Sequence, residues 1–492
     1  MKTSPIRLSR PLLVGALALA LAACASSRGL QPQGRLLDAD SLHAGQTLAG
    51  SGLSASGFPA ADWWRALGDA QLDALVEEGL RNSPSLDIAD ARLRQARAQV
   101  AGAQADRLPS LSVSPGYTGM RLPESMLGDE AGGHYAGSVQ AVLNFSYGVD
   151  LWGGKRATWE AAVDSNHAAT VDAQAARLDL STGIVQAYLE LAHAWELQHV
   201  ANDELARADK TLSLTRQRRS AGIDSELQVR QAEARLPVAK QQQLAAQQQM
   251  DAARNALAAL LGQGPDRGLQ IAQPQPLNPL ALQLPGVLPS ELLGRRPDIV
   301  AARWRVEAAG RQIDAAKARF YPSLNLTALG GVVSKDIGSL LESGSTFGIL
   351  APALSLPIFD GGRLRAGLAT RDADYDLAVS SYNRAVVDAL RDVADQVNAV
   401  RSLTTQVETQ QQAMSIAQAA YELAQQRYRA GIGNYLDVLS TQDLLLQAQQ
   451  RLSNLQSQRL LSSVRLSAAL GGGFQPADNA LPVAVESDTT HS

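Results

Sequence analysis

The chain has 492 residues and a formal net charge of −4, and aromatic residues make up only 4% of it. A weakly acidic chain without a general basic field argues against nucleic acid as a partner. Long stretches rich in Ala, Leu, Gln and Arg, with few aromatic residues, are typical of extended helices and poor for a large compact core. No run of 18 apolar residues follows residue 24, so no helix of the mature chain is expected to cross a membrane.

The first 23 residues have the pattern of a signal peptide. Lys2, Arg7 and Arg10 precede an apolar run that begins at Pro11 and ends in Leu-Ala-Ala-Cys, with Cys24 last. This ending resembles a bacterial lipobox, which implies an N-palmitoyl, S-diacylglycerol cysteine at Cys24, and two or more acyl chains anchor a protein stably on a bilayer. The alternative is an unmodified thiol at the end of the signal peptide. Because Cys24 is the only cysteine, no internal disulfide or thiolate metal cluster is possible.

The rest of the chain contains one unit twice. Asn-Ser-Pro-Ser-Leu at 82–86 is answered by Arg-Arg-Pro-Asp-Ile at 295–299, and the glycine of Ser-Ala-Gly-Ile at 220–223 is answered 209 residues later by that of Arg-Ala-Gly-Ile at 429–432. The predicted parts are a signal peptide at 1–23, a lipid-anchored linker at 24–61, a first repeat at 62–262, a Pro-rich connector at 263–289, a second repeat at 290–471 and a tail at 472–492.

Each repeat is expected to contain one long coiled helix followed by a turn and a returning helix. No proline lies between Lys155 and Ser220, so up to 66 residues could be helical, about 100 Å at 1.5 Å per residue. In the second repeat, apolar residues fall on every seventh position, the period of a coiled coil. These residues are Val379, Val386, Val393, Val400, Val407, Met414, Tyr421 and Tyr428. Tip turns are expected near Gly222 and Gly431.

Strands are predicted between the helices, at about 108–118, 138–152, 321–333 and 346–359. From Val139 to Leu151 apolar residues alternate with mostly polar ones, which favours a membrane β-barrel strand over an ordinary half-buried sheet. Trp152 and Phe359 are candidate interface aromatics. Four strands cannot close into a barrel, and open edges are not tolerated in lipid. Eight strands leave no aqueous lumen, so a duct needs at least three chains and twelve strands, a homotrimer.

The sequence resembles the TolC-fold outer-membrane factors, in the lipoprotein (OprM/NodT-like) branch that serves resistance-nodulation-division (RND) efflux pumps. The resemblance covers about residues 60–472 and rests on Asp62-Trp63-Trp64, on the run from Leu288 to Leu326, and on the turn from Tyr428 to Leu439. It implies a trimeric twelve-stranded β-barrel continuous with a twelve-helix coiled-coil tunnel, in the outer membrane and extending into the periplasm. It also implies a passive exit duct for drugs or other small molecules, with a periplasmic adaptor and an inner-membrane RND pump as partners and no cofactor.

The resemblance further implies a periplasmic gate, where acidic side chains face the lumen just after the second turn. Asp437 falls on the first such position, and Ser440 occupies the second, so these two positions do not establish a double acidic ring. The alternative for Asp437 is a solvated carboxylate near a helix N-terminus. Tyr428 is either packing or a latch, and Tyr435 is a further candidate.

The two turns are the expected contact with the adaptor. They comprise Ser220, Ala221, Gly222 and Ile223 in the first repeat and Arg429, Ala430, Gly431 and Ile432 in the second. Small residues permit close approach of backbones, although a turn chosen only for its geometry explains the glycines equally well.

Other functions find less support in the sequence. The six histidines are scattered without metal-ligand spacing, and no nucleophile elbow, Walker loop or dinucleotide fingerprint is present, so an enzyme is not expected. A channel for secreted proteins is the rival within the same fold. A periplasmic coiled-coil spacer without a pore is the rival from another class, and it predicts no amphipathic strands.

Overall fold

The computed structural model describes residues 27–38, 41–42, 58–121, 123, 125, 133, 135–280 and 294–475. Cys24 lies outside the described residues. Two compact units are present, each built from three segments of the chain. The first comprises Met1–Leu36, Leu93–Ala169 and Ala302–Tyr382, and the second comprises Leu37–Arg92, Thr170–Ala301 and Asn383–Ser492.

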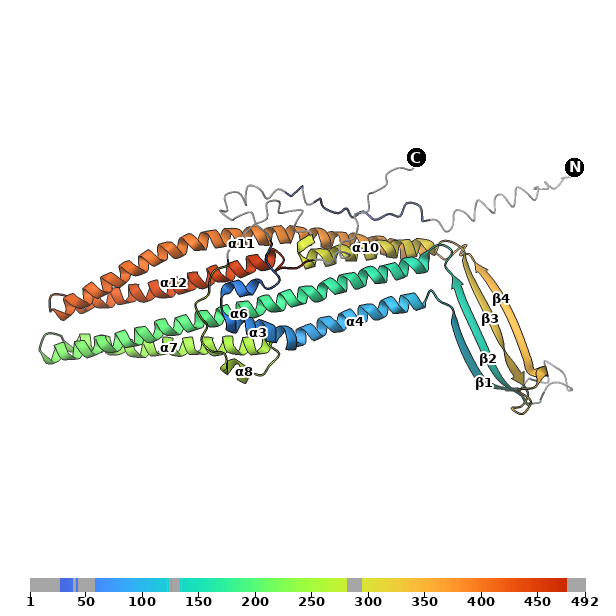
Figure 1. The fold of residues 1–492 in the computed structure, drawn as a ribbon, viewed down its shortest axis with the longest axis horizontal. Coiled ribbons are helices and arrows are strands. Elements are labelled where there is room, and N and C mark those ends of the chain that lie inside the picture. The colour runs from blue at the N-terminus through green and yellow to red at the C-terminus, as the bar shows by residue number, and fades with distance from the viewer. Residues whose placement is uncertain are drawn as a thin grey trace, which may run out of the picture. The chain divides into compact units, whose positions relative to one another are not determined.

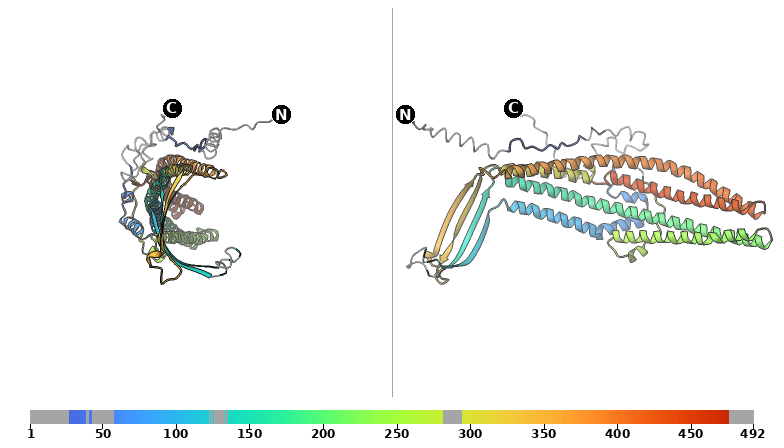
Figure 2. Two further views of the ribbon diagram at one scale, coloured as in Figure 1. Left: turned by 90° about the vertical axis from the view of Figure 1, so that its right-hand side faces the viewer. Right: turned by 180° about the vertical axis from the view of Figure 1, so that it is seen from behind.

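The first unit contains a four-stranded antiparallel sheet in the order β1-β2-β3-β4, and its strands are curved (Figures 1 and 2). The strands are β1 Ser110–Arg121, β2 Tyr135–Val149, β3 Ser323–Ser334 and β4 Thr346–Ser355, with a short 3-10 helix, η3 Ser343–Ser345, before β4. Strand β2 ends three residues before the expected position. The Asp150 carboxylate accepts hydrogen bonds from the backbone N–H groups of Lys155 and Arg156, so the chain turns there into a helix.

The register of the sheet places apolar residues of all four strands on one face. Paired residues share a face, and β2 pairs Leu143 with Val113 of β1 and Val149 with Leu324 of β3. The apolar face carries Leu111, Val113, Tyr117, Val139, Ala141, Leu143, Phe145, Tyr147, Val149, Leu324, Leu326, Ala328, Val332, Leu350, Pro352 and Leu354. The opposite face carries the polar residues Ser110, Ser112, Ser114, Gln140, Asn144, Ser146, Ser323, Asn325, Thr327 and Ser355, together with the apolar residues Met120, Val142, Leu329, Val333, Phe347 and Ile349. The alternation predicted for one strand therefore extends to β1 and to the first half of β3, whereas β4 is apolar on both faces.

The two repeats fold into elements of matching length. Helix α4 (Pro84–Ala105) corresponds to α10 (Pro297–Ala318), with 22 residues each. The long helices α6 (Gly154–Ser220) and α11 (Arg363–Arg429) have 67 residues each. The returning helices α7 (Glu226–Leu260) and α12 (Tyr435–Ala469) have 35 residues each. Among the strands, β1 and β3 have 12 residues each, whereas β2 has 15 and β4 has 10.

The N-terminal segment packs along α11. The backbone N–H groups of Gln33 and Gly34 donate to Oδ1 of Asp376, at 2.8 and 2.6 Å. In the first unit, Leu30 packs against the buried cluster of Ile313, Phe320 and Leu368.

The second unit contains two long hairpins, formed by the C-terminal parts of α6 and α11 with α7 and α12, and their turns lie at the same end (Figure 1). Its largest core also uses the short elements η2 (Trp63–Leu67) and α3 (Ala70–Asn82), and α8 (Asp266–Leu269) follows α7. Trp63, Trp64 and Leu72 are buried there with Ile184 and Leu257.

One buried carboxylate ties this core together. Asp69 accepts hydrogen bonds through Oδ2 from the Tyr188 hydroxyl, at 2.6 Å, and from the backbone N–H of Gln275, at 3.0 Å. Its Oδ1 accepts from the backbone N–H of Gln71, at the start of α3. Burial and the bond to Asp69 raise the pKa of Tyr188 well above its usual range, so the hydroxyl stays a donor.

The seven-residue stripe of α11 is mostly buried. Val379, Val386, Val393, Val407, Tyr421 and Tyr428 are each at most 5% exposed. Val400 and Met414 are only half-buried. No helix of the described part of the chain combines the length and the apolar character needed to cross a bilayer.

Candidate functional site at the hairpin turns

The two hairpin turns share one backbone geometry. In the first, the N–H of Ile223 donates to the Arg218 carbonyl and the N–H of Gly222 to the Arg219 carbonyl. The bonds of Ile432 and Gly431 repeat this pattern, which is a Schellman motif at the end of each long helix. Gly222 and Gly431 have φ of +76° and +79°, where a side chain is strained. A Cβ on either glycine would meet no atom of this chain within 4 Å, so backbone conformation alone accounts for glycine at these turns.

The residues around the turns are exposed, as a contact surface requires. Ile223 is 59% and Ile432 is 72% exposed. Ser220, Ala221, Ala430 and Arg429 are exposed as well. The Ser220 hydroxyl donates to the Gln217 carbonyl, so it helps to end α6. The eight predicted tip residues therefore form two small surfaces, one on each hairpin.

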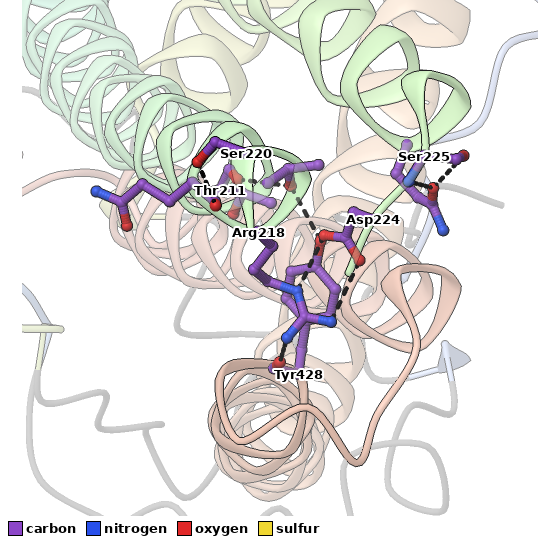
Figure 3. Close-up of polar contacts among 9 residues, drawn as sticks. Thr211, Arg218, Ser220, Asp224, Ser225 and Tyr428 are labelled. Atoms are coloured by element: carbon purple, nitrogen blue, oxygen red, sulfur yellow. Dashed lines mark hydrogen bonds and ion pairs between the residues drawn. The ribbon is translucent and has the colours of Figure 1, made fainter. Parts of the chain in front are cut away.

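Behind the turns lies a buried polar cluster, the tip latch, made of Thr215, Arg218, Asp224 and Tyr428. Figure 3 labels Arg218, Asp224 and Tyr428 of this cluster. The Arg218 guanidinium binds Asp224 through two hydrogen bonds, of 2.9 and 3.2 Å, and donates to the Tyr428 carbonyl oxygen. The Tyr428 hydroxyl donates to Oδ2 of Asp224 and lies 3.2 Å from Oγ1 of Thr215. The latch thus joins the end of α11 to the end of α6 and the turn after it.

The latch is almost fully shielded from solvent. Arg218 is 8% and Tyr428 is 1% exposed, and the guanidinium carbon lies 4.2 Å from the centre of the Tyr428 ring. The hydrogen bonds to Asp224 raise the pKa of Arg218 above its usual range. Burial, together with the bond to Asp224, raises the pKa of Tyr428 to about 12. The latch therefore holds a charged pair and a neutral phenol at physiological pH.

Tyr428 is both packed and hydrogen bonded, and its role in a gate stays a prediction. Its ring packs in a cluster with Leu212, Val229 and Tyr435, and its hydroxyl and carbonyl groups are hydrogen bonded. The centres of the Tyr428 and Tyr435 rings are 6.0 Å apart.

Asp437 and Ser440 lie on the exposed side of the first turns of α12. Asn434 caps this helix by accepting a hydrogen bond from the Asp437 backbone N–H at 3.0 Å. Ser440 directs its hydroxyl back to the Asp437 carbonyl oxygen at 3.2 Å. The Asp437 carboxylate is therefore free to face solvent near a helix N-terminus, and neither residue belongs to the buried latch.

A second polar layer joins the hairpins farther from the turns. Glu204 of α6 is 3% exposed and accepts a hydrogen bond from the Gln442 amide of α12 at 2.6 Å. Arg207 contacts the same carboxylate at 3.2 Å and donates to Gln449. Burial raises the pKa of Glu204. This layer adds a further polar connection between the hairpins.

The sequence did not reveal Arg218, Asp224 or Thr215 as functional candidates. One signal was available, because Asp224 corresponds to Gly433 when the repeats are aligned on their turns. Where two repeats share a backbone conformation and differ in residue type, the side chain of one repeat is expected to have a role that the other lacks. Within the described residues, no three His, Cys, Asp or Glu side chains gather as metal ligands.

Each half of the chain supplies two strands of a sheet with one apolar face and one long helical hairpin. This arrangement defines the class of TolC-fold channel subunits. The solved structure of the outer membrane protein VceC from Vibrio cholerae matches with a TM-score of 0.78 and 38% identity, over 85% of this chain and 100% of that one.

Sequence comparison gives the same class. The model of the Outer membrane efflux protein family matches residues 75–263 and 288–472. The fusaric acid resistance protein FusA of Burkholderia cepacia is 36% identical over 74% of this chain and 69% of its own length. The multidrug resistance outer membrane protein MdtP of Escherichia coli K12 is 30% identical over 86% of this chain and 88% of its own length. The chain belongs to the outer membrane efflux protein family, whose members are channels.

Proposed function

We propose that this protein is the passive exit duct of a tripartite efflux system and works as a homotrimer. The observation that carries the proposal is the sheet, which has one apolar face and two edge strands, β1 and β4. In lipid an unpaired strand edge is costly, because no water satisfies its backbone groups. Pairing β4 of one chain with β1 of the next satisfies both edges, and three chains supply a twelve-stranded barrel wide enough for water. The six long hairpins of three chains supply a twelve-helix tunnel.

Native mass spectrometry of the detergent-purified protein tests this architecture. We expect a trimer as the main species, because each exposed edge then finds a partner. A stable monomer or dimer of the wild type would contradict the proposed barrel.

The cargo proposed for the duct is drugs or other small molecules. FusA and MdtP carry names that refer to fusaric acid and multidrug resistance, which supports small-molecule cargo over the rival of secreted proteins. Deletion of the gene should increase drug accumulation in cells and leave protein secretion unchanged. Loss of a secreted protein without any change in drug accumulation would support the rival.

The proposed periplasmic gate consists of a carboxylate ring and the latch residue Tyr428. Asp437 of three chains would place three negative charges around one constriction, which attract cations, and Ser440 would add a hydroxyl ring. We expect Asp437→Ala to weaken cation preference and block by multivalent cations in planar bilayers. Equal selectivity and equal block in wild type and variant would make Asp437 an ordinary surface carboxylate.

The proposed partners are a periplasmic adaptor at the hairpin turns and an inner-membrane RND pump behind it. The exposure of Ile223 and Ile432 at the turns supports this contact. Ile432→Asp should abolish co-purification of the adaptor, since it places a charge on the contact surface. Ile416→Asp, at a side chain that is 69% exposed farther along α11, is the matched control and should have no effect. Equal loss in both variants would argue against a contact at the turn.

The proposed location is the outer membrane, with a lipid anchor at Cys24. The anchor is supported by the sequence, in which the apolar run ends in Leu-Ala-Ala-Cys at Cys24. Radiolabelled palmitate should enter the wild type and not Cys24→Ser. Equal labelling would refute the anchor and leave the duct unaffected.

A further inference from the structure

The first unit contains an open cavity of about 770 Å³ at the base of the sheet. It lies where β2 leads into α6, where α10 leads into β3, and where β4 leads into α11. The lining includes Gly148, Ser323, Asn325 and Ser355. These four residues belong to the mostly polar face of the sheet, whereas Val149 and Leu324, which also line the cavity, belong to the apolar face. The cavity therefore surrounds the ends of the strands and is reached from the polar face through these four residues.

The charged groups around this cavity are mostly positive. Its lining contains Lys155, Arg319, Arg363 and Arg371, and Asp150 as the acid. Both oxygens of Asp150 already accept hydrogen bonds from backbone N–H groups of α6. Arg371 contacts Asp374 at 3.1 Å.

Three of these cations have no carboxylate partner within the part of the chain that the structure describes. They are Lys155, Arg319 and Arg363. The Lys155 ammonium and the Asn325 amide oxygen both lie 3.0 Å from where a Cβ on Gly148 would be, so the ammonium sits over the polar face of the sheet. A side chain in place of Gly148 would displace one of them. A net positive charge therefore borders the cavity.

Two aromatic rings complete the lining. Trp152 and Tyr321 are stacked with centres 4.7 Å apart, and both are 51% exposed. The Trp152 indole N–H donates to the Pro322 carbonyl oxygen at 2.8 Å, which fixes the ring and satisfies its donor. The exposed parts of the pair offer apolar surface beside the cations. A cationic site next to an aromatic surface suits a molecule that carries both a carboxylate and a ring.

We infer that this cavity is a binding site for small aromatic carboxylates in transit through the duct. The inference rests on the proposed function, because that function places the polar face of the sheet against a water-filled lumen. Lys155, Arg319 and Arg363 bind the carboxylate, and the Trp152–Tyr321 pair packs against the ring. In a trimer the site is present three times around the lumen.

Binding of benzoate to the purified trimer, followed by saturation-transfer NMR, tests the inference, with benzamide as the uncharged counterpart. The variant combines Lys155→Gln, Arg319→Gln and Arg363→Gln. The control removes three cations outside the cavity, by Lys210→Gln, Lys240→Gln and Arg384→Gln. Wild type and control should bind benzoate at least about tenfold more tightly than benzamide, and the cavity variant should lose that preference. Benzoate binding should also weaken as salt is raised.

Several results would overturn the site. Equal affinity for benzoate and benzamide in the wild type, or unchanged benzoate affinity in the cavity variant, removes its basis. Loss of co-purified acidic phospholipid from the cavity variant, with benzoate affinity unchanged, assigns the cations to lipid headgroups instead. Planar-bilayer currents of the same trimers separate the two proposals. A wild type that conducts and does not bind benzoate refutes the site alone, whereas a wild type without current refutes the duct.

Discussion

At the hairpin turns, the two repeats have the same backbone conformation but differ in single residues. Both turns use glycine with positive φ and the same pair of backbone hydrogen bonds. The latch, however, takes Arg218 and Asp224 from the first repeat and Tyr428 from the second. The sequence predicted the turns because glycine marks them locally. It could not predict the latch, because Asp224 and Tyr428 are 204 residues apart and meet only in the folded chain.

Removal of the Tyr428 hydroxyl should weaken the latch. Tyr428→Phe removes one of the two hydrogen bonds to Oδ2 of the Asp224 carboxylate and leaves that of Arg218, so we expect a loss of about 1–3 kcal/mol in the free energy of unfolding. The pKa of Tyr428 is about 12 in the folded protein, above its value of about 10 in the unfolded chain. The hydroxyl therefore stabilises the fold fully below about pH 10, and its contribution disappears as the pH rises through 12.

Thermal unfolding from pH 8 to 12 measures this effect. The difference in stability between wild type and Tyr428→Phe should be constant up to about pH 10 and should shrink above it. A difference that is absent at pH 8, or that grows at high pH, would contradict the assigned role of the hydroxyl.

At the scale of elements, the local sequence pattern predicted the helices and strands. The positions of their ends depend on contacts that the pattern does not contain. The seven-residue period predicted the buried stripe of α11, yet Val400 and Met414 on that stripe are only half-buried. Periodicity predicts which face of the helix a side chain lies on, but not how completely neighbouring residues bury it. The alternation in β2 likewise continues to Leu151, but Asp150 ends the strand by capping α6.

The stripe of α11 can be tested with two valines of the same helix. Val393 is 0% exposed and packs with Val397, Leu466 and Leu470, whereas Val387 is 47% exposed. Val393→Asp buries a charge without a partner and should cost several kcal/mol, about 3 or more. Val387→Asp keeps its charge in water and should cost less than about 1 kcal/mol. Denaturant unfolding of both variants measures the difference, and similar losses would refute the packing of this seam.

At the scale of the whole molecule, one chain contains only part of the proposed duct. The sequence predicted the duplication and the amphipathic strands, and the fold contains both. The number of chains follows from a physical requirement, the closure of β1 and β4 in lipid, and is not encoded in any local motif. The cavity cations also escaped sequence reasoning, because they lie far apart in the chain: Lys155 and Arg363 are in the first turns of α6 and α11, and Arg319 follows α10.

Single-channel conductance in planar bilayers tests the central claim, that the trimer is a gated duct, most directly. Wild type, Asp224→Ala and the surface control Asp209→Ala are compared. Asp224→Ala leaves the buried Arg218 charge unpaired and removes the acceptor of Tyr428, so it should loosen the tip where the hairpins meet. We expect small conductance steps for wild type and control and several-fold larger steps for Asp224→Ala. Steps of equal size in all three, or no current from inserted trimers of any, would contradict the account.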